Sequence, residues 1–418
     1  MLFRSLQLCP PQVYGAGGTA SAPADWKIPA VEIVDEPYFD NIRGLHIDVS
    51  RHFLDKQEVF QVIDILAMHK LNTLHIHLTD NQGWRMEIRA FPRLTEVGAI
   101  GCHSSLAEGP ARYFTQQDLR EIIAYAESRY IRVMPEIDMP GHMAAAIRSY
   151  PDLQCPNDQR EMPCVIRIDE PGADFCRRVL TEVREVFGEV PIHVGFDEVN
   201  FGQDQPIYTD EEILGFSRAM TGFIKNDLGV TPVFWDDALE RGLNDPDVLM
   251  QWWRSGRRYW WKNRALTFDQ ELQLKDQPYI LSPSDWLYFD MKNTKDADGT
   301  EWSGTIAVDK IYRWEPLLDL VAADPAKRAL AQGVIACTWS EQIRDFDAWQ
   351  DRVFPRIAAL AEKGWAQPAD IDTSKPSWET WRDEVLIKKQ IPRYEAMDVN
   401  YWSRNRPQDL RRLGSDQG

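Results

Sequence analysis

The chain has 418 residues, 44% of them hydrophobic, and carries a formal net charge of −18 at pH 7. This length and apolar content suffice for one large α/β domain or two smaller ones. A surface this acidic argues against nucleic acid and anionic membranes as partners. The sequence also lacks a run of about 18 apolar residues, so no membrane-spanning helix is expected.

The N-terminal residues and the cysteines bear on compartment and redox state. The start, MLFRSLQLCPPQ, lacks the long apolar core and the cleavage site of a signal peptide, so cytoplasmic, periplasmic and secreted locations all stay open. Residues 14–30 are rich in Gly, Ala, Ser and Pro and predict a surface linker. No C-x-x-C pair occurs, which argues against zinc. Cys155 and Cys164 are close enough for a local disulfide, and buried free thiols are the alternative.

Apolar runs and helical periodicity alternate along the rest of the chain. Strands are predicted over residues 43–50, 72–80, 131–139, 191–199, 231–239, 247–253, 277–285 and 332–341. Helices are predicted over residues 55–70, 114–130, 174–188, 210–229 and 354–366. Thr115 with Asp118 three residues later is a capping signal, and Gly229 suits a helix C-terminus.

Eight strands that mostly alternate with helices favour parallel strands joined by crossover helices. Because several of the strands are almost continuously apolar, they are expected to be buried on both faces. The pattern predicts an α/β protein with a (β/α)8 TIM barrel over residues 33–370. Residues 371–418 are polar and rich in Arg and Trp, and they predict a helical extension packed on the barrel. No G-x-G-x-x-G or Walker loop follows the first strand, which weakens a nucleotide-binding alternative.

Polar and aromatic side chains gather where these strands end. In a barrel of this kind the active site lies at the carboxyl ends of the strands. Each such residue has an ordinary explanation: a Trp can fill the core, and Asp236 and Asp237 can cap the following helix. The coincidence across strands nevertheless suggests carbohydrate hydrolysis, since indole faces stack on sugar rings. The residues are His75, His77, Asp80, Glu136, Asp138, His142, Asp197, Glu198, Trp235, Asp236, Asp237, Trp252, Trp253, Trp286, Tyr288, Asp290, Trp339 and Glu341, with Arg43 at the start of the first strand.

The adjacent carboxylates Asp197 and Glu198 require a particular mechanism. Most glycosidases use two carboxyl groups on opposite sides of the scissile bond. Consecutive strand residues point to opposite faces, so both can reach one ligand only if the strand ends or bulges there. Even then they would approach the same side of the sugar. This arrangement suits a reaction in which the substrate supplies its own nucleophile.

Six motifs resemble those of glycoside hydrolase family 20, the β-N-acetylhexosaminidases. They are RGLHIDVSRHFL, LHIHLTDNQGWR, PEIDMPGH, HVGFDEV, YRWEP and TWSE, in this order from about residue 33 to 366. The resemblance implies a (β/α)8 barrel that removes terminal β-linked GlcNAc or GalNAc from glycans, glycoconjugates or chitooligosaccharides with retention. It implies that the 2-acetamido oxygen of the substrate attacks C1 and forms an oxazolinium intermediate, without a cofactor or a metal.

The resemblance also implies roles for individual residues. Glu198 matches the general acid/base, and Asp197 matches the group that orients the acetamide N–H. His142, with Asp138 or Asp80 behind it, matches the group that tunes Glu198. Tyr288 and Asp290 match the pair that bonds the acetamide oxygen and flanks the leaving group. Sugar binding is implied for Arg43, Glu341, Trp235, Trp253 and Trp339.

Three departures from the family pattern leave alternatives open. Phe196 replaces the second of two glycines that usually precede the acidic pair, and it would point into the barrel core. Asp80 stands alone where two aspartates are usual. Residues 1–32 resemble only a remnant of the α+β domain that precedes many family barrels, so either the domain is absent, with a homodimer covering the barrel instead, or the chain is a fragment. The alternatives to hexosaminidase activity are a lacto-N-biosidase-like or 6-sulfo-GlcNAc-releasing relative and a non-catalytic sugar-binding protein.

Overall fold

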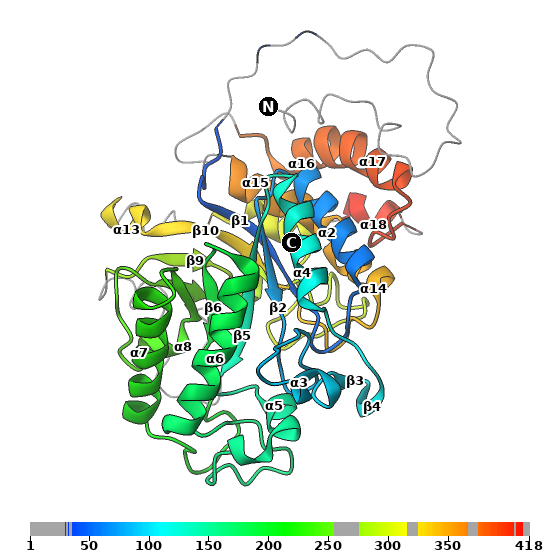
Figure 1. Cartoon of the computed structure of the whole chain (residues 1–418). Coiled ribbons are helices and arrows are strands. Elements are labelled where there is room, and N and C mark those ends of the chain that lie inside the picture. Colours follow the sequence, from blue (N-terminus) through cyan, green and yellow to red (C-terminus); the bar gives the residue numbers. More distant parts are fainter. Residues whose placement is uncertain are drawn as a thin grey trace.

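The computed structural model describes residues 30, 32, 36–254, 276–315, 325–366, 375–404 and 407–412. Within them, eight parallel strands close into a barrel in the order β1-β10-β9-β8-β7-β6-β5-β2 (Figure 1). The strands are β1 (Ile42–Asp48), β2 (Thr73–His77), β5 (Arg132–Met139), β6 (Ile192–Gly195), β7 (Pro232–Trp235), β8 (Leu249–Trp252), β9 (Tyr279–Leu281) and β10 (Ala331–Ala336). Each overlaps one of the eight predicted strands, so the predicted (β/α)8 TIM barrel is confirmed.

The five predicted helices are also present. They are α2 (Lys56–Met68), α4 (Gln116–Glu127), α6 (Glu170–Phe187), α7 (Asp210–Asn226) and α15 (Arg356–Trp365). The expected capping box at α4 is present, because Thr115 accepts the Asp118 N–H at 3.0 Å and Asp118 accepts the Thr115 N–H at 3.1 Å. Helix α7 ends before the predicted boundary, and Gly229 lies in the following turn with φ +69°.

Shorter elements occupy the connections between strands and helices. The antiparallel hairpin β3 (Ile100–Cys102) and β4 (Ser105–Ala111) follows β2 and was not predicted. The short helices are α3 (Arg93–Glu96), α5 (Ala144–Ser149), η2 (Pro151–Leu153), α8 (Asp237–Glu240), α10 (Ser284–Leu287), α11 (Val308–Arg313), α13 (Pro325–Ala329) and α14 (Phe346–Val353). Most of the predicted N-terminal linker lies outside the described residues.

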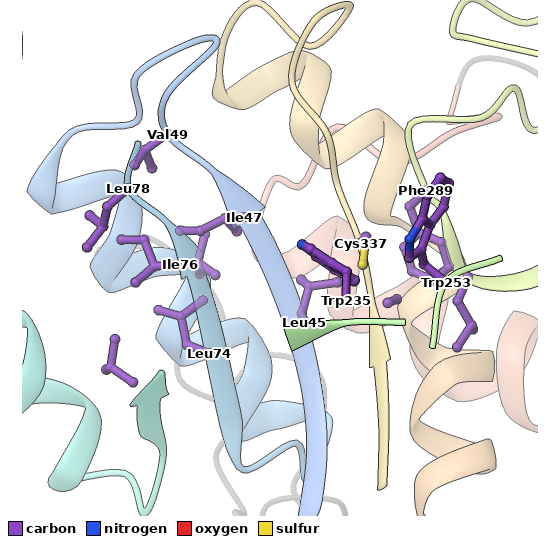
Figure 2. Packing of buried hydrophobic residues seen from close by; sticks show 14 of the residues in the cluster. Leu45, Ile47, Val49, Leu74, Ile76, Leu78, Trp235, Trp253, Phe289 and Cys337 are labelled. Atoms are coloured by element: carbon purple, nitrogen blue, oxygen red, sulfur yellow. The ribbon is translucent and has the colours of Figure 1, made fainter. Parts of the chain in front are cut away.

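Alternation along the strands separates two kinds of buried side chain. Apolar residues such as Ile47, Leu74 and Ile76 lie beside one another (Figure 2) and belong to one large hydrophobic cluster with the surrounding helices. The residues between them, among them His46 and His75, contact one another inside the barrel, with ring centroids 4.8 Å apart. Since successive strand residues point to opposite faces, the apolar set anchors the helices and the polar set faces the barrel axis.

The C-terminal segment is helical and packs on the barrel helices. It comprises α16 (Trp378–Trp381), η3 (Arg382–Gln390), α17 (Ile391–Ala396) and α18 (Pro407–Arg412). Trp381 is buried, its ring lies 4.5 Å from Tyr312 of α11, and its indole N–H donates to Glu362 of α15 at 3.0 Å. Cys155 and Cys164 are both buried free thiols. None of the described helices is long and apolar enough to span a membrane.

Candidate active site

The acidic pair lies just after β6, where the backbone leaves the strand conformation. Gly195, Phe196 and Glu198 have φ values of +66°, +67° and +49°, so the strand ends immediately before the pair. As a result both carboxylates face one nitrogen. His142 Nε2 lies 3.5 Å from Asp197 Oδ2 and 3.7 Å from Glu198 Oε2. The broken strand therefore brings the two side chains to the same side.

The second nitrogen of His142 faces Asp80. Asp80 Oδ1 lies 3.3 Å from His142 Nδ1, so Asp80, and not Asp138, is the partner of this ring. Burial alone would lower the pKa of His142, but the carboxylates of Asp80 and Asp197 outweigh it and raise that pKa well above its ordinary value. Both ring nitrogens thus carry protons, and His142 is an imidazolium between carboxylates.

Asp197 has a strongly perturbed acidity. Burial raises the pKa of Asp197 to about 7, and the neighbouring charges of Asp237 and Glu198 act in the same direction against the opposing effect of His142. Asp138 lies against the same turn, where an added Cβ on Gly195 would come within 1.8 Å of Asp138 Oδ1. Burial and the charge of Asp197 raise the pKa of Asp138 well above its usual value. The pair therefore lies in a crowded acidic environment in which only some carboxyl groups are charged.

Arg51, which sequence reasoning missed, belongs to this group. Its Nη2 lies 2.8 Å from Asp80 Oδ2 and 3.7 Å from Glu341 Oε1. The guanidinium also lies over the ring of Trp339, 5.1 Å from its centroid. Asp48 fixes the turn by accepting the backbone N–H of Arg51 at 3.0 Å. Arg51 follows the end of β1, which is the signal that could have identified it.

Arg43 does not reach the site, and the expectation that it binds the sugar is corrected. It is the second residue of β1 and therefore lies at the opposite end of the barrel. Its guanidinium donates to the carbonyl oxygens of Phe39, Asp40 and Lys70 at 2.7 to 3.2 Å. Trp365 covers it, with its ring centroid 5.2 Å from the guanidinium carbon. These contacts make Arg43 a structural residue.

Four of the predicted aromatic residues form one connected group, whereas Trp286 stacks on Trp314 instead. Trp235 and Tyr288 both contact Trp339, with ring centroids 5.8 and 6.1 Å apart. Trp253 stacks on Tyr288 at 6.2 Å. Trp302, which the sequence did not single out, stands edge-on to Tyr288 at 5.8 Å and is 53% exposed. Indole and phenol rings from four strand ends thus form a continuous aromatic group at the carboxyl end of the barrel.

Three further carboxylates hold or flank these aromatic rings. The alternative role of Asp236, to cap the following helix with its side chain, is not realised. Instead Asp236 accepts the backbone N–H of Trp253 at 3.1 Å, and Asp237 accepts the indole N–H of Trp253 at 2.8 Å. Asp290 accepts the hydroxyl of Thr300 at 2.9 Å, and burial raises the pKa of Asp290 to about 7. Asp236 and Asp237 therefore position an aromatic wall.

Phe196 points away from the acidic pair. The expectation that its side chain points into the barrel core is wrong. Its fully buried ring lies 6.3 Å from Phe216 of α7, between the strand and the helix layer. A left-handed backbone costs a non-glycine residue about 1–2 kcal/mol, whereas burying a Phe side chain gains roughly 1.5–3 kcal/mol. Packing against α7 thus offsets the strained conformation.

Among the residues that the structure describes, three groups of ligand-type side chains have atoms close enough together to hold an ion. They are His46, His75 and Glu136; Asp80, Asp138 and His142; and His142, Asp197 and Glu198. In the last two, Arg51 and His142 already supply positive charge to the carboxylates. Ion pairing within the protein therefore accounts for the last two groups.

Comparison with known proteins identifies the family. Residues 41–368 match the model of glycosyl hydrolase family 20, catalytic domain. The chain is 31% identical to a beta-hexosaminidase of Vibrio furnissii, with 84% of this chain and 59% of the relative covered. It is 31% identical to a beta-N-acetylhexosaminidase of Cellulomonas fimi, with 82% and 67% covered. The chain thus spans as little as 59% of these relatives' lengths.

Solved structures agree with this match. The beta-N-acetylhexosaminidase of Streptomyces coelicolor has a TM-score of 0.81 at 31% identity, with 96% of this chain and 78% of that chain covered. A mutant Streptomyces plicatus beta-hexosaminidase in complex with its product GlcNAc has a TM-score of 0.80 at 31% identity, with 95% and 76% covered. The family match, the closed parallel barrel and these relatives together show that the chain belongs to glycosyl hydrolase family 20.

Proposed function

We propose that the protein is a retaining exo-β-N-acetylhexosaminidase that removes terminal β-linked GlcNAc or GalNAc from glycans. The observation that carries this proposal is the shared position of Asp197 and Glu198. Both carboxylates face the same nitrogen of His142, at 3.5 and 3.7 Å. A carboxylate nucleophile would have to attack from the face of the sugar opposite the acid, about 5–5.5 Å away. The pair therefore supports attack by the substrate's own acetamide oxygen.

In this reaction Glu198 donates a proton to the leaving oxygen and later accepts one from water. Asp197, as an anion, accepts the acetamide N–H and balances the positive charge that develops on the oxazolinium. Tyr288 holds the attacking acetamide oxygen, which is a positioning effect. Asp290 follows Tyr288 in the same loop and flanks the leaving group. The stacked Trp253 and the buried Trp235 form the walls around the acetamide methyl.

We assign recognition of the sugar hydroxyls to Arg51 and Glu341. A guanidinium is a planar fork that suits neighbouring oxygens, and Arg51 is oriented by Asp48 and Asp80. Glu341 is one-third exposed beside it and accepts hydrogen bonds from the sugar hydroxyls. Trp339 supports the ring face of the sugar. Trp302, exposed at the outer edge of the aromatic group, contacts the leaving sugar.

Substrate analogues test the mechanism. The purified protein is expected to hydrolyse p-nitrophenyl GlcNAc and to release the β-anomer first, as read by proton NMR. The glucoside that carries a hydroxyl in place of the acetamide should not be cleaved. A thiazoline mimic of the cyclised sugar should bind far more tightly than GlcNAc, as transition-state-like ligands do. Release of the α-anomer, or cleavage of the glucoside at a comparable rate, would refute the proposal.

The two arginines of the first motif separate sugar recognition from stability. Arg51→Lys loses the planar fork, so we expect KM for p-nitrophenyl GlcNAc to rise about tenfold or more, with a small change in thermal midpoint. Arg43→Lys is the matched control, because a lysine cannot donate to the same three carbonyl oxygens in the same geometry. It should lower the midpoint and leave KM unchanged. The reverse pattern would return Arg43 to the sugar-binding role.

The acidic limb of the pH profile should report Asp197. Its pKa lies near 7, so kcat/KM is expected to rise with pH as the free enzyme forms the Asp197 anion. Asp237→Asn removes a neighbouring negative charge and should move this limb to lower pH, while its side-chain oxygen still accepts the Trp253 indole N–H. Asp210→Asn, on the exposed start of α7, is the control and should leave the profile unchanged. A limb that stays in place in Asp237→Asn contradicts this assignment.

A further inference from the structure

Beneath the site, a buried carboxylate fills the centre of the barrel. Glu136 of β5 is fully buried, and four polar side chains from neighbouring strands surround it. Oε2 lies 2.8 Å from His77 Nδ1 and 3.0 Å from His75 Nε2. Oε1 lies 3.1 Å from His193 Nδ1 and accepts the Trp235 indole N–H at 2.8 Å. Glu136 thus connects the interior of the barrel to an aromatic wall of the site.

His77 links Glu136 to the site because both of its nitrogens face carboxylates. Nδ1 pairs with Glu136, and Nε2 lies 2.9 Å from Asp80 Oδ2. Arg51 Nη1 lies 3.4 Å from the same Nε2, which is a longer contact. Although burial opposes the charged form, the carboxylates near both nitrogens raise the pKa of His77 well above its ordinary value, which favours a proton on each nitrogen. His77 is therefore a fixed imidazolium, like His142 on the other side of Asp80.

The two oxygens of Asp80 are divided between these partners. Asp80 Oδ2 lies 2.9 Å from His77 Nε2 and 2.8 Å from Arg51 Nη2. Asp80 Oδ1 lies 3.3 Å from His142 Nδ1 and accepts the backbone N–H of Asn81 at 2.6 Å. Because His77 and Arg51 together occupy Oδ2, the carboxylate cannot rotate without losing two charged contacts. This arrangement holds Oδ1 toward His142.

Negative and positive groups alternate from Glu136 through His77 and Asp80 to His142. Burial opposes each ionisation, yet the paired charges lower the pKa of Glu136 and Asp80 well below the usual values and raise that of His77 well above it. Burial lowers the pKa of His75 to about 4 and that of His46 well below its usual value, so these two rings are neutral. The groups facing His77 are His46, Asp48, Arg51, His75, Asp80, Glu136 and Asp138.

We propose that Glu136 and His77 are positioning residues for proton donation, which they support through Asp80 and His142. They form a second carboxylate–imidazole pair in the chain Glu136–His77–Asp80–His142–Glu198. The inference rests on the proposed hydrolase function. When Glu198 gives up its proton, the new negative charge forms beside the His142 imidazolium, which Asp80 holds in place. No proton needs to pass from Glu198 to the residues behind it, since Glu136, His77, Asp80 and His142 each keep their charge.

Substrates with different leaving groups distinguish this role from a general structural one. Dinitrophenyl GlcNAc expels its leaving group without a proton, whereas a GlcNAc dimer needs one. We expect Glu136→Gln and His77→Gln to lose about tenfold more kcat/KM on the dimer than on the dinitrophenyl substrate. His75→Gln is the matched control. It contacts the same oxygen of Glu136, but it has no carboxylate on its other nitrogen and should lower both rates equally.

The outcomes separate this inference from the proposed function. An inactive wild-type protein would refute the proposed function itself. An active wild type whose His77 and Glu136 variants lose both substrates equally, or whose His75 variant shows the same selective loss, would overturn the positioning role. Neutron diffraction of the unmodified protein covers the case in which the variants fail to fold. It should show deuterons on both nitrogens of His77 at pH 7, and a ring with only one would overturn the proposal.

Discussion

Glu198→Gln is expected to lose about 10²–10⁴-fold of kcat on a GlcNAc dimer while the fold stays intact. The amide cannot donate a proton with the acidity of a carboxyl group, so the step that expels the sugar slows. Stability should change by less than about 0.5 kcal/mol, because the side chain is one-quarter exposed and its nearest ion-pair partner, His142, is 3.7 Å away. Steady-state kinetics and thermal unfolding measure the two effects.

The control and the substrate make this test specific. Glu211→Gln changes an exposed carboxylate at the start of α7 and should keep full activity. The Glu198→Gln defect should be much smaller on dinitrophenyl GlcNAc, whose departure needs no proton. A thermal midpoint that falls by many degrees would make Glu198 structural. Equal losses on both substrates would assign the proton to another group.

The barrel was predictable because its signals are local. Several strands are short, almost continuously apolar runs, and α4 begins with Thr115 and Asp118 in the expected reciprocal contact. The β3–β4 hairpin gave no such signal. The residues of β4 are nearly all exposed, so burial imposes no alternation on them, and a Gly and a Pro interrupt the run. Elements whose side chains are mostly exposed leave little trace in the hydrophobic pattern.

The sequence predicted which strand ends carry the site, but it could not predict which side chains contact one another there. The first motif contains Arg43 and Arg51, and composition alone cannot choose between them. Their positions distinguish them, because Arg43 is the second residue of β1, whereas Arg51 lies beyond the carboxyl end of that strand. By contrast, the role of His77 depends on which atoms meet across the barrel. Neither the spacing of His75 and His77 nor their type shows that only His77 bridges two carboxylates.

The relative orientation of Asp197 and Glu198 depends on the local backbone conformation, which the sequence pattern does not give. A strand that continued through Phe196 would have turned Asp197 and Glu198 to opposite faces. Left-handed residues on either side of Asp197 change this, and Phe196 adopts such a conformation without being glycine. Its tolerance comes from α7, which buries the ring beside Phe216. The departure from two glycines is therefore compensated outside the barrel wall.

Gly195→Ala is expected to damage both the fold and the catalytic pair. A methyl group there would lie 1.8 Å from Asp138 Oδ1 and 2.4 Å from its Cγ, so the backbone or the carboxyl group has to move. The residue also has φ +66°, which an L side chain adopts at a cost. Strain and overpacking together should lower the free energy of unfolding by about 2–5 kcal/mol. Because Asp197 and Glu198 follow directly, a shift of about 1 Å should also reduce kcat by about 100-fold.

Gly229→Ala is the control that introduces the backbone strain without the steric clash. Gly229 has nearly the same φ, +69°, but an added Cβ there meets nothing within 4 Å. It should therefore show only the left-handed penalty of about 1–2 kcal/mol, with kcat unchanged. Denaturant unfolding and steady-state kinetics on both variants measure the difference. If Gly195→Ala were no less stable than Gly229→Ala and kept its kcat, the turn could accommodate the methyl group. The contact with Asp138 would then not be what positions the pair.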